Sequence, residues 1–315
     1  MSHQTKGKKP LVSVIVPTFN RPAMLKDALK SIAAQTYRPI EVIVVNDAGS
    51  DVESIVSRSI GRDPVIYLTH ASNKGLAAAR NTGLRGATGD YITYLDDDDV
   101  YYPDHVQTLV SFLSVSELKV AYTDAHQAEE LLLNKTTPRF WLRDTPQRAL
   151  SFLYQSNMSR LLPSSQPYMK LSNTGVDIFF RGGYNYRIVR RTIPFSHEFD
   201  REMMLVRNLI PVICIMHHRS CLERTGLFDE TLTTHEDWDL WIRMSREYDF
   251  AHIKRITCEY TVRGDGSNMT RAIRADFKRT MEIIYQKYRY LAINPRILEA
   301  QKASLQALEK ELASA

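Results

Sequence analysis

The segment YITYLDDDD, Tyr91–Asp99, joins a short apolar run directly to four consecutive aspartates. The apolar run Leu11–Val16 leads in the same way to the polar residues Thr18–Arg21. The run Glu41–Asn46 leads to a turn-forming stretch that ends at Asp51. Continuous apolar runs of this length are typical of buried parallel strands. Because ligands of parallel sheets bind at the carboxyl ends of the strands, we expect the three polar segments to share one ligand-binding rim.

Amphipathic helices separate these runs, so the chain follows the alternation of an α/β protein. We predict strands at 11–16, 41–46, 65–69, 91–95, 212–217 and 252–262, and helices at 22–35, 52–59, 76–85, 104–113, 219–225, 237–248 and 271–315, the last one interrupted at 294–295. The expected fold is a Rossmann-like, mostly parallel central sheet flanked by helices, with a C-terminal helical extension.

Residues 126–200 interrupt the alternation, with many polar and aromatic residues and several prolines, and we interpret them as a variable insert beside a cleft. The length of 315 residues suggests roughly two domains at ~150 residues each. We divide the chain into a disordered tail at 1–10, a first half at 11–125, the insert at 126–200, a second half at 201–270 and a helical extension at 271–315.

The composition excludes several classes of protein. Hydrophobic residues make up 43% and charged residues 24%, which is ordinary for a globular protein with a sizeable core. The net charge of +5 favours an anionic ligand but is too small and dispersed to indicate nucleic acid. The longest apolar run, Leu209–Met216, is too short to span a membrane, and the basic N-terminal tail lacks the apolar stretch of a signal peptide. The three cysteines show no CxxC spacing, which favours reduced, buried thiols in a cytoplasmic protein.

The acidic cluster Asp96–Asp99 is the first candidate for chemistry. Four adjacent carboxylates repel one another, so cations or hydrogen-bond donors must compensate them. Mn²⁺ and Mg²⁺ take oxygen ligands and often bridge one or two carboxylates to a substrate phosphate. The alternative is an acidic surface turn that caps the following helix. We expect a bound metal, rather than the surplus lysines and arginines, to balance this charge.

Three further motifs carry polar side chains in positions suited to a site. In VVNDAGSD, Asp47 suits a nucleobase N–H, although a plain turn explains the motif equally well. In NKGLAAARNTG, Arg80 is expected beside the strand-end carboxylates, where it suits phosphate, unless it is an ordinary surface residue. In HEDWDLWIRMS, Glu236 and Asp237 open a helix, where they serve either as catalytic carboxylates or as helix caps. The histidines lack the spacing of a zinc site.

Taken together and in order, VSVIVPTFNRP, EVIVVNDAGSD, NKGLAAARNTGLRGATGDYITYLDDDD, GLFDE and HEDWDLWIR resemble the family 2 glycosyltransferases with a GT-A fold. The resemblance covers about 11–115 and 211–268. It implies one GT-A domain, with a nucleotide-sugar-binding half at 11–125 and an acceptor-binding half at 201–270. It also implies inverting transfer of a sugar from a nucleoside diphosphate, of the UDP type, to a hydroxyl of a glycan, lipid-linked or other acceptor. Mn²⁺ or Mg²⁺ is the implied cofactor, and synthesis of a polysaccharide or other cell-surface glycan is the implied process.

The resemblance also implies roles for single residues. Asp237 is the implied catalytic base, and Glu236 binds the acceptor or orients the site. The donor nucleotide is assigned to Pro17, Thr18, Asn20, Asp47, Arg80, Asp96 and Asp97, of which the first four would hold the base and ribose. The metal is assigned to Asp98 together with Asp96.

The loop after the last predicted strand departs from the family pattern, because 260–268 contains no histidine. Arg263 is then a candidate for contact with the diphosphate, and Asp265 is a candidate metal ligand. The chain also lacks the QxxRW motif and a membrane span, which argues against a processive polysaccharide synthase.

Other functions and partners stay open at this level. A sugar-phosphate nucleotidyltransferase shares a similar fold, and a catalytically silent sugar-nucleotide-binding scaffold is a further alternative. The Glu-Asp pair at 236–237 argues against both. Leu298, Leu305 and Leu312 either form a short coiled coil between two subunits or pack on the chain's own core. The mild basic charge permits peripheral association with the inner face of a membrane.

Overall fold

A computed structural model describes residues 9–131, 168–170, 176–181, 185–263 and 274–313. The chain divides into two compact units. The first unit comprises residues 1–125, 195–260 and 273–315, and the second comprises residues 126–194 and 261–272. The acidic turn, Arg80 and the Glu236-Asp237 pair all belong to the first unit.

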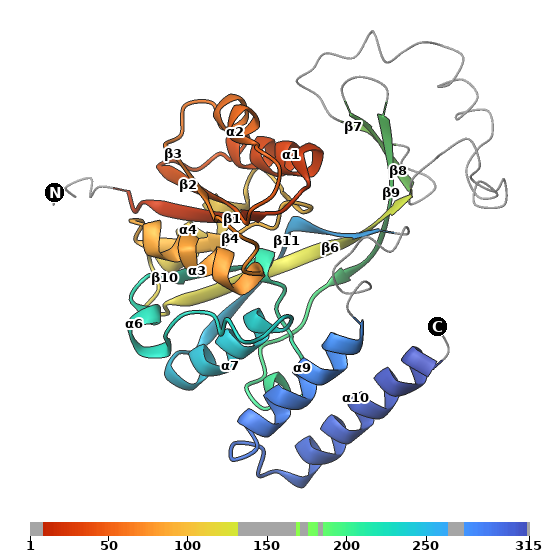
Figure 1. The fold of residues 1–315 in the computed structure, drawn as a ribbon. Coiled ribbons are helices and arrows are strands. Elements are labelled where there is room, and N and C mark those ends of the chain that lie inside the picture. Colours follow the sequence, from red (N-terminus) through yellow and green to blue (C-terminus); the bar gives the residue numbers. More distant parts are fainter. Residues whose placement is uncertain (1–8, 132–167, 171–175, 182–184, 264–273, 314–315) are drawn as a thin grey trace, which may run out of the picture. The chain divides into compact units, whose positions relative to one another are not determined.

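The central sheet of the first unit has a parallel core with antiparallel additions (Figure 1). The parallel strands lie in the order β3 (Val65–Thr69), β2 (Ile40–Asn46), β1 (Val12–Thr18) and β4 (Tyr91–Tyr94). The antiparallel pairs are β10 (Ile215–His218) with β4 and with β6 (Val120–Leu131), and β5 (Val100–Tyr101) with β11 (Phe250–Arg263). The predicted α/β architecture is confirmed.

The register of the parallel strands places their polar ends together. Thr18 pairs with Asn46, and Asn46 in turn pairs with Thr69. On the far side of β1, Ile15 pairs with Tyr94, two residues before Asp96. The polar segments that follow β1, β2 and β4 therefore share one rim, as the apolar runs predicted.

The helices fall within one or two residues of their predicted limits, except that the first C-terminal helix ends at Lys287, well before the predicted break at 294–295. They are α1 (Pro22–Ala33), α2 (Glu53–Ser59), α3 (Leu76–Gly86), α4 (His105–Leu113), α6 (Cys221–Thr225), α7 (Glu236–Glu247), α9 (Arg274–Lys287) and α10 (Pro295–Ala313), with short 3-10 turns η3 (Met203–Leu205) and η4 (Val212–Cys214). The predicted strand at 212–217 is wrong in its first half. There the amide of Cys214 donates to the carbonyl of Pro211, which closes a 3-10 turn before β10 begins.

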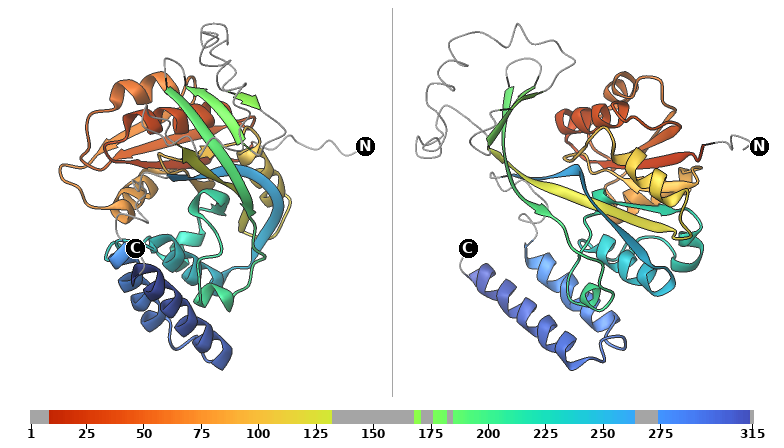
Figure 2. Two further views of the ribbon diagram at one scale, coloured as in Figure 1. Left: turned by 90° about the vertical axis from the view of Figure 1, so that its right-hand side faces the viewer. Right: turned by 180° about the vertical axis from the view of Figure 1, so that it is seen from behind.

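The C-terminal helices pack on the face of α7 that points away from the sheet core. Trp238 and Ile242 of α7 form a separate buried cluster with residues of α9 and α10, among them Ile284 and Ile297. Figures 1 and 2 show α9 and α10 as an antiparallel helical hairpin. Leu305 and Leu308 pack against this cluster, and Leu298 is 37% exposed. Leu305 therefore packs on the chain's own core, the second of the two alternatives.

The second unit contains an antiparallel arrangement that the sequence did not predict. Strands β7 (Tyr168–Lys170), β8 (Val176–Arg181) and β9 (Asn185–Phe195) pair in that order. Strands β6 and β11 begin in the first unit and end in the second. The predicted insert therefore contains strands, although much of the range 126–200 lies outside the described residues.

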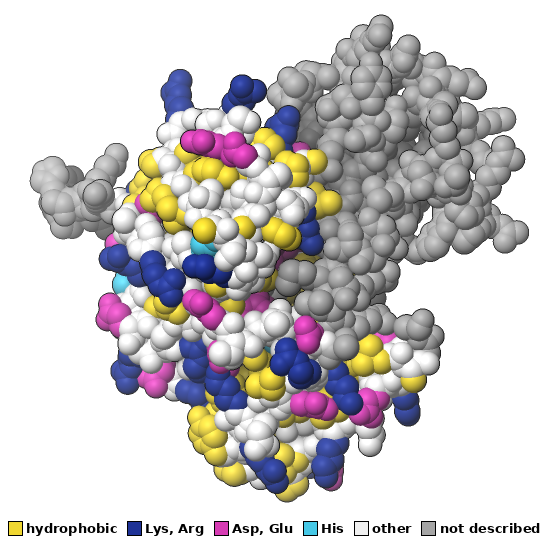
Figure 3. Space-filling view, viewed as in Figure 1, with side chains coloured by type: hydrophobic (Ala, Val, Ile, Leu, Met, Phe, Trp, Pro, Cys, Tyr) yellow, Lys and Arg dark blue, Asp and Glu magenta, His cyan; other side chains and the backbone are white. Residues whose placement is uncertain are grey.

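Two predicted properties of the surface and core can be compared with the structure. Within the described ranges, no helix is long and apolar enough to cross a membrane. All three cysteines are buried free thiols. Figure 3 shows basic and acidic side chains interspersed over the described part of the face in view.

Close packing of α3 on the sheet depends on Gly83. A Cβ atom at this position would lie 2.6 Å from Cγ2 of Ile15 in β1 and 3.4 Å from Cγ2 of Val45 in β2. The preceding residues Ala77, Ala78 and Ala79 are also buried. The small side chains of α3 thus hold the helix that carries Arg80 close to the strand ends.

Gly83→Ala should therefore destabilise the protein by about 1–3 kcal/mol, because the added methyl overpacks a buried contact. Gly86→Ala is the matched control on the same helix, since a Cβ there would meet its nearest atoms at an ordinary 3.7 Å. It should be neutral, or stabilising by up to about 1 kcal/mol. Urea denaturation of both variants measures the difference; equal unfolding midpoints would contradict this account of α3.

Candidate active site

The acidic turn alternates between buried and half-buried carboxylates. Asp97 and Asp99 are 4% and 2% exposed, while Asp96 and Asp98 are half-buried. The amide of Asp99 donates to the carbonyl of Asp96 at 3.1 Å and closes the turn. Asp96 and Asp98 are therefore the pair with access to a ligand, whereas Asp97 and Asp99 serve the protein interior.

Two arginines bind this turn. The guanidinium of Arg80 contacts Oδ1 of Asp96 at 2.7 Å. Nη1 of Arg21 lies 3.2 Å from Oδ1 of Asp97 and 3.2 Å from Oδ2 of Asp98. Two arginines thus compensate part of the charge that we expected a bound metal, rather than the surplus lysines and arginines, to balance. The position of Arg80 beside these carboxylates is as predicted, whereas the contacts of Arg21 were not predicted.

Arg80 is fully buried, so the alternative of an ordinary surface arginine is also wrong. It is 1% exposed, and its second ion pair joins Nη1 to Oε1 of Glu236. Burial would lower the pKa of Arg80, but the carboxylates of Asp96, Glu236 and Asp237 outweigh it and raise that pKa. The ring of Phe228 lies 5.5 Å from the guanidinium carbon. The side chain thus links the end of β4 to the start of α7 from within the protein.

The first turn of α7 presents Glu236 and Asp237 differently. Glu236 is 4% exposed, and burial raises its pKa to about 7 although Arg80 opposes this. Asp237 is half-buried and accepts a hydrogen bond from Nδ2 of Asn208 at 2.9 Å and another from the amide of Trp238 at 2.7 Å. Burial also raises the pKa of Asp237, with Arg80 again opposing. Asp237 is thus the more accessible of the two carboxylates.

Helix α7 is anchored on both sides of this first turn. Nε1 of Trp238 donates to the carbonyl of Met204 at 2.6 Å, and Nε1 of Trp241 donates to that of Ile210 at 3.2 Å. His235, which precedes the helix, has a φ of 62°, a left-handed conformation that side chains other than glycine rarely adopt. The packing of the two indoles holds the helix start in this conformation.

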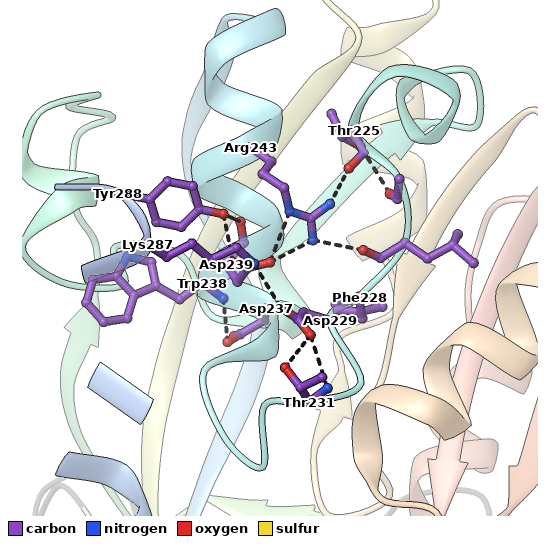
Figure 4. A network of polar contacts seen from close by, with 12 residues as sticks. Thr225, Phe228, Asp229, Thr231, Asp237, Trp238, Asp239, Arg243, Lys287 and Tyr288 are labelled. Carbon is purple, nitrogen blue, oxygen red and sulfur yellow. Dashed lines mark hydrogen bonds and ion pairs between the residues drawn. The ribbon is translucent and has the colours of Figure 1, made fainter. Parts of the chain in front are cut away.

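A buried polar network joins α7 to α9 and to the segment before α7 (Figure 4). Asp239 is fully buried and accepts from Nε of Arg243 at 3.0 Å, from the hydroxyl of Tyr288 at 2.7 Å and from Nζ of Lys287 at 2.7 Å. The guanidinium of Arg243 also donates to the carbonyls of Thr225 and Leu227. Three donors compensate one buried carboxylate, which couples the C-terminal helices to the helix that carries Asp237.

The GLFDE segment is held to α3 by Asn81, the neighbour of Arg80. Nδ2 of Asn81 donates to the carbonyl of Phe228 at 2.9 Å and to Oε1 of Glu230 at 2.8 Å, and its Oδ1 accepts from the amide of Phe228 at 2.9 Å. Arg80 and Asn81 therefore attach α3 to two successive motifs of the second half of the chain.

The residues assigned to the nucleotide base lie at the ends of β1 and β2. Asp47 accepts from the amides of Lys74 and Gly75, both at 2.8 Å, and its Oδ1 lies 2.7 Å from Nδ1 of His70. A carboxylate has about four acceptor positions, so roughly one remains for a ligand. The Asp47 carboxylate thus first of all holds the loop that leads into α3.

The other three assigned residues also have internal roles. The hydroxyl of Thr18 donates to Oδ2 of Asp97 at 2.7 Å. Oδ1 of Asn20 accepts from the amide of Ser50 at 2.8 Å, with Asn20 in a left-handed conformation at φ 55°. Pro17 is buried in β1 and pairs with Val45. The structure brings all of them to the same rim.

A cavity of about 410 Å³ opens beside this rim. Its lining residues are Asn46, Ala48, Gly49, Asp51, Glu53, Tyr67, Thr69 and His70. Nε2 of His70 lies 2.9 Å from the hydroxyl of Thr82, so this ring is held between Thr82 and Asp47. The cavity is therefore polar and has a fixed wall.

The carboxylates at the rim fit a divalent ion that a bound substrate would also coordinate. Among the described residues, no three His, Cys, Asp or Glu side chains form a cage for a metal. Asp96 and Asp98 nevertheless supply two accessible carboxylates, and Mg²⁺ often needs only one or two of these together with substrate phosphates. Arg263 ends β11, but its side chain, like the whole of Asp265, lies outside the described part of the chain.

Sequence reasoning gave no individual role to four residues that the structure places at the site: Arg21, His70, Asn81 and Asn208. Arg21 and Asn81 belong to motifs that the sequence had already singled out, directly beside Asn20 and Arg80. Asn208 carries no comparable signal, because it lies outside every motif and reaches Asp237 only through the fold.

Comparison with known proteins now identifies the family. The model described as "Glycosyl transferase family 2" matches residues 13–191, more than half of the 315 residues. The chain belongs to glycosyltransferase family 2. It is 29% identical over 237 residues to an uncharacterized glycosyltransferase of Rickettsia prowazekii, covering 75% of this chain and 59% of that protein. It is 23% identical to the uncharacterized glycosyltransferase YwdF of Bacillus subtilis, covering 88% of this chain and 84% of that protein.

Solved structures support the GT-A fold. The structure of S. aureus TarS 1–349 in complex with UDP-GlcNAc matches with a TM-score of 0.54 at 17% identity, covering 87% of this chain and 65% of that one. The mannosyltransferase PcManGT from Pyrobaculum calidifontis, in complex with GDP-Man and Mn²⁺, matches with a TM-score of 0.54 at 19% identity. The match covers 98% of this chain and 80% of that one. At these identities the likeness shows the fold alone.

The Asp239 network makes a testable claim about the C-terminal extension. Lys287→Met should lower the free energy of unfolding by about 1–2 kcal/mol, because it removes one of three donors from a buried carboxylate while the aliphatic chain still packs. Lys278→Met is the matched control on α9, since Lys278 pairs with the exposed carboxylates of Glu282 and Glu309 rather than with a buried one. Its unfolding midpoint in urea should stay that of the unchanged protein. Equal effects of the two substitutions would argue against a structural role for the network.

Proposed function

We propose that the protein transfers a sugar from a nucleoside diphosphate donor of the UDP type to an acceptor hydroxyl, with inversion at the anomeric carbon. The observation that carries the proposal is the half-buried carboxylate of Asp237 at the start of an anchored helix. Arg80 links this helix to the acidic turn, through Glu236 on one side and Asp96 on the other. The proposed catalytic base, Asp237, and the acidic turn that would bind the donor are thereby held in one rigid site.

Asp237 is the proposed general base. Its carboxylate accepts the proton of the acceptor hydroxyl while the oxygen attacks the anomeric carbon from the face opposite to the nucleoside diphosphate. The new glycosidic bond forms as the bond to the diphosphate breaks, so the configuration inverts. A single carboxylate is sufficient for this step, unlike the pair that flanks the bond in glycoside hydrolysis.

Asn208 and Glu236 position this base rather than react. The amide of Asn208 occupies Oδ2 of Asp237 at 2.9 Å and leaves the carboxylate with further acceptor positions for the substrate. Glu236 is held by Arg80, and its burial supports an orienting role over direct contact with the acceptor.

The acidic turn is the proposed site for the diphosphate end of the donor. Asp96 and Asp98 would hold Mn²⁺ or Mg²⁺, which when bound offsets the negative charge that develops on the leaving diphosphate. The presence of Mn²⁺ in the PcManGT complex supports this assignment. Arg263 and Asp265 remain proposed contacts to the diphosphate and to the metal.

The base and ribose are proposed to bind along Thr18, Asn20 and Asp47, next to the cavity beside His70. The nucleotides in the TarS and PcManGT complexes carry different bases, uracil and guanine. The single acceptor position left on Asp47 suits one base N–H and supports a UDP donor. We assign the acceptor, a glycan, lipid-linked or other hydroxyl compound, to the side formed by 201–270.

Asp237→Asn tests the proposed base. It should lower kcat by about 10²–10⁴-fold, since the amide cannot take the proton, while the Kd for the donor stays within about twofold. Because burial raises the pKa of Asp237, kcat of the unchanged protein should fall as the pH drops through that raised pKa and the base becomes protonated. Glu247→Gln, at the other end of α7, is the control and should turn over normally. Normal turnover by Asp237→Asn as well would remove this residue from the mechanism.

A donor panel with and without EDTA tests the reaction class. UDP-sugars should raise the melting temperature and release UDP in a Mn²⁺-dependent manner, and EDTA should abolish the release. Release of pyrophosphate from a sugar phosphate and a nucleoside triphosphate would instead indicate a nucleotidyltransferase. Binding of sugar nucleotides without any release would indicate a catalytically silent protein, and preference for GDP-sugars would overturn the UDP assignment.

A further inference from the structure

Three successive carbonyls, those of residues 204–206, accept hydrogen bonds from side chains of three different helices. They belong to η3 and to the residue that follows it. The donors are, in the same order, Nε1 of Trp238 in α7 at 2.6 Å, Nε2 of Gln301 in α10 at 2.7 Å and the hydroxyl of Tyr285 in α9 at 2.7 Å. Donors and acceptors are all on buried residues. The C-terminal helices α9 and α10 therefore supply two of the three donors.

Buried carbonyls at this place need donors from outside the turn. The last carbonyls of a helical turn have no partner within it, and a buried carbonyl without a partner is costly. The side chains of Leu205 and Val206 also pack in the buried cluster that α9 and α10 share with α7. Tyr285 and Gln301 thus fix the path of the backbone immediately before Asn208.

Asn208 is itself held in one orientation. Its Oδ1 accepts from the amide of Ile210 at 3.1 Å, so its Nδ2 points the other way. There Nδ2 donates to Oδ2 of Asp237 at 2.9 Å, while the amide of Trp238 donates to Oδ1 of Asp237 at 2.7 Å. One donor on each oxygen fixes the plane of this carboxylate.

The backbone carries a movement of Val206 to Asn208. Two peptide units separate the two residues, at most about 7 Å of chain. Hydrogen bonds of this kind extend to only about 3.2 Å, so a displacement of ~0.5 Å is enough to weaken the contact with Asp237. The position of the Asp237 carboxylate therefore depends on how firmly residues 204–206 are held.

We propose that Tyr285 and Gln301 are positioning residues for the base: by holding residues 204–206 they keep Asn208 on the carboxylate of Asp237. The inference rests on the proposed role of Asp237 as general base. Tyr285 and Gln301 act through Asn208, which presents the carboxylate to the attacking hydroxyl in one orientation. The C-terminal helices thereby contribute to turnover as well as to stability.

Tyr285→Phe and Gln301→Met test this link, because each removes a donor and keeps nearly the same volume. With the sugar nucleotide that the donor panel shows to be turned over fastest, and with water as the acceptor, kcat should fall about three- to tenfold in each variant. The KM for that sugar nucleotide should stay within about twofold, since the loss affects the base and not donor binding. Tyr290→Phe and Gln306→Met are the matched controls, because they make the same changes on exposed side chains. Both should turn over normally.

An Asn208→Ala background separates positioning from stability. Asn208→Ala should itself lower kcat at least as much, and adding Tyr285→Phe or Gln301→Met should lower it no further, because the link ends at Asn208. Tyr285→Phe also removes a hydrogen bond between the hydroxyl and Ser304, which Gln301→Met leaves in place. A loss that comes from that contact, or from general destabilisation, would persist in the Asn208→Ala background.

Hydrogen exchange gives a readout that needs no substrate. The amides of Leu205, Val206 and Ile210 donate to acceptors within residues 202–208. They should exchange faster in Tyr285→Phe and Gln301→Met than in the two control variants. If Tyr285→Phe does not fold, Gln301→Met decides the question by itself.

The opposite results are distinct. Normal kcat in both variants, or in Asn208→Ala, overturns the role of Tyr285 and Gln301, whatever the exchange rates, and leaves the proposed base intact if Asp237→Asn is slow. An undiminished further loss of kcat in the Asn208→Ala background also overturns it, since the two residues then act on stability alone. Normal turnover by Asp237→Asn, or no release of nucleoside diphosphate from any sugar nucleotide, overturns the proposed function and this inference together.

Discussion

The guanidinium of Arg80 lies between two carboxylates, one from the first half of the chain and one from the second. Asp96 follows β4, and Glu236, which is 156 residues from Arg80, opens α7. A buried charge is tolerated only when its partners are in place, so the positions of these three side chains depend on one another. The end of the sheet and the start of the helix are thereby held at a fixed separation, which a reaction between two bound substrates requires.

Much of the surrounding structure supports that ion pair. Gly83 and the alanines before it bring α3 close to the sheet, and Asn81 secures the GLFDE segment against the same helix. On the other side, the Asp239 network ties α7 to α9 through Lys287 and Tyr288. The C-terminal helices thus belong to the framework of the site, although they contribute none of its candidate reactive groups.

Sequence reasoning succeeded where a local pattern has a single structural outcome. Apolar runs that end in polar residues predicted the rim, and the pairing of Thr18 with Asn46 confirms it. The prediction that Arg80 lies beside the strand-end carboxylates is confirmed by its contact with Asp96. The same reasoning failed at Val212, where a 3-10 turn replaces the predicted strand. It also failed in 126–200, because the sequences of β8 and β9 lack a regular alternation of apolar and polar residues.

The sequence by itself determined the α/β fold, the family and the set of ionisable groups at the rim, because apolar periodicity and motif order are local properties of the chain. Only the tertiary structure decided which charges meet. Four adjacent aspartates are equivalent in the sequence. In the structure, Asp96 pairs with the buried Arg80, Asp97 binds Thr18 and Arg21, and Asp98 shares Arg21 with Asp97. Those differences follow from burial and from partners on distant segments, and neither is encoded within the motif itself.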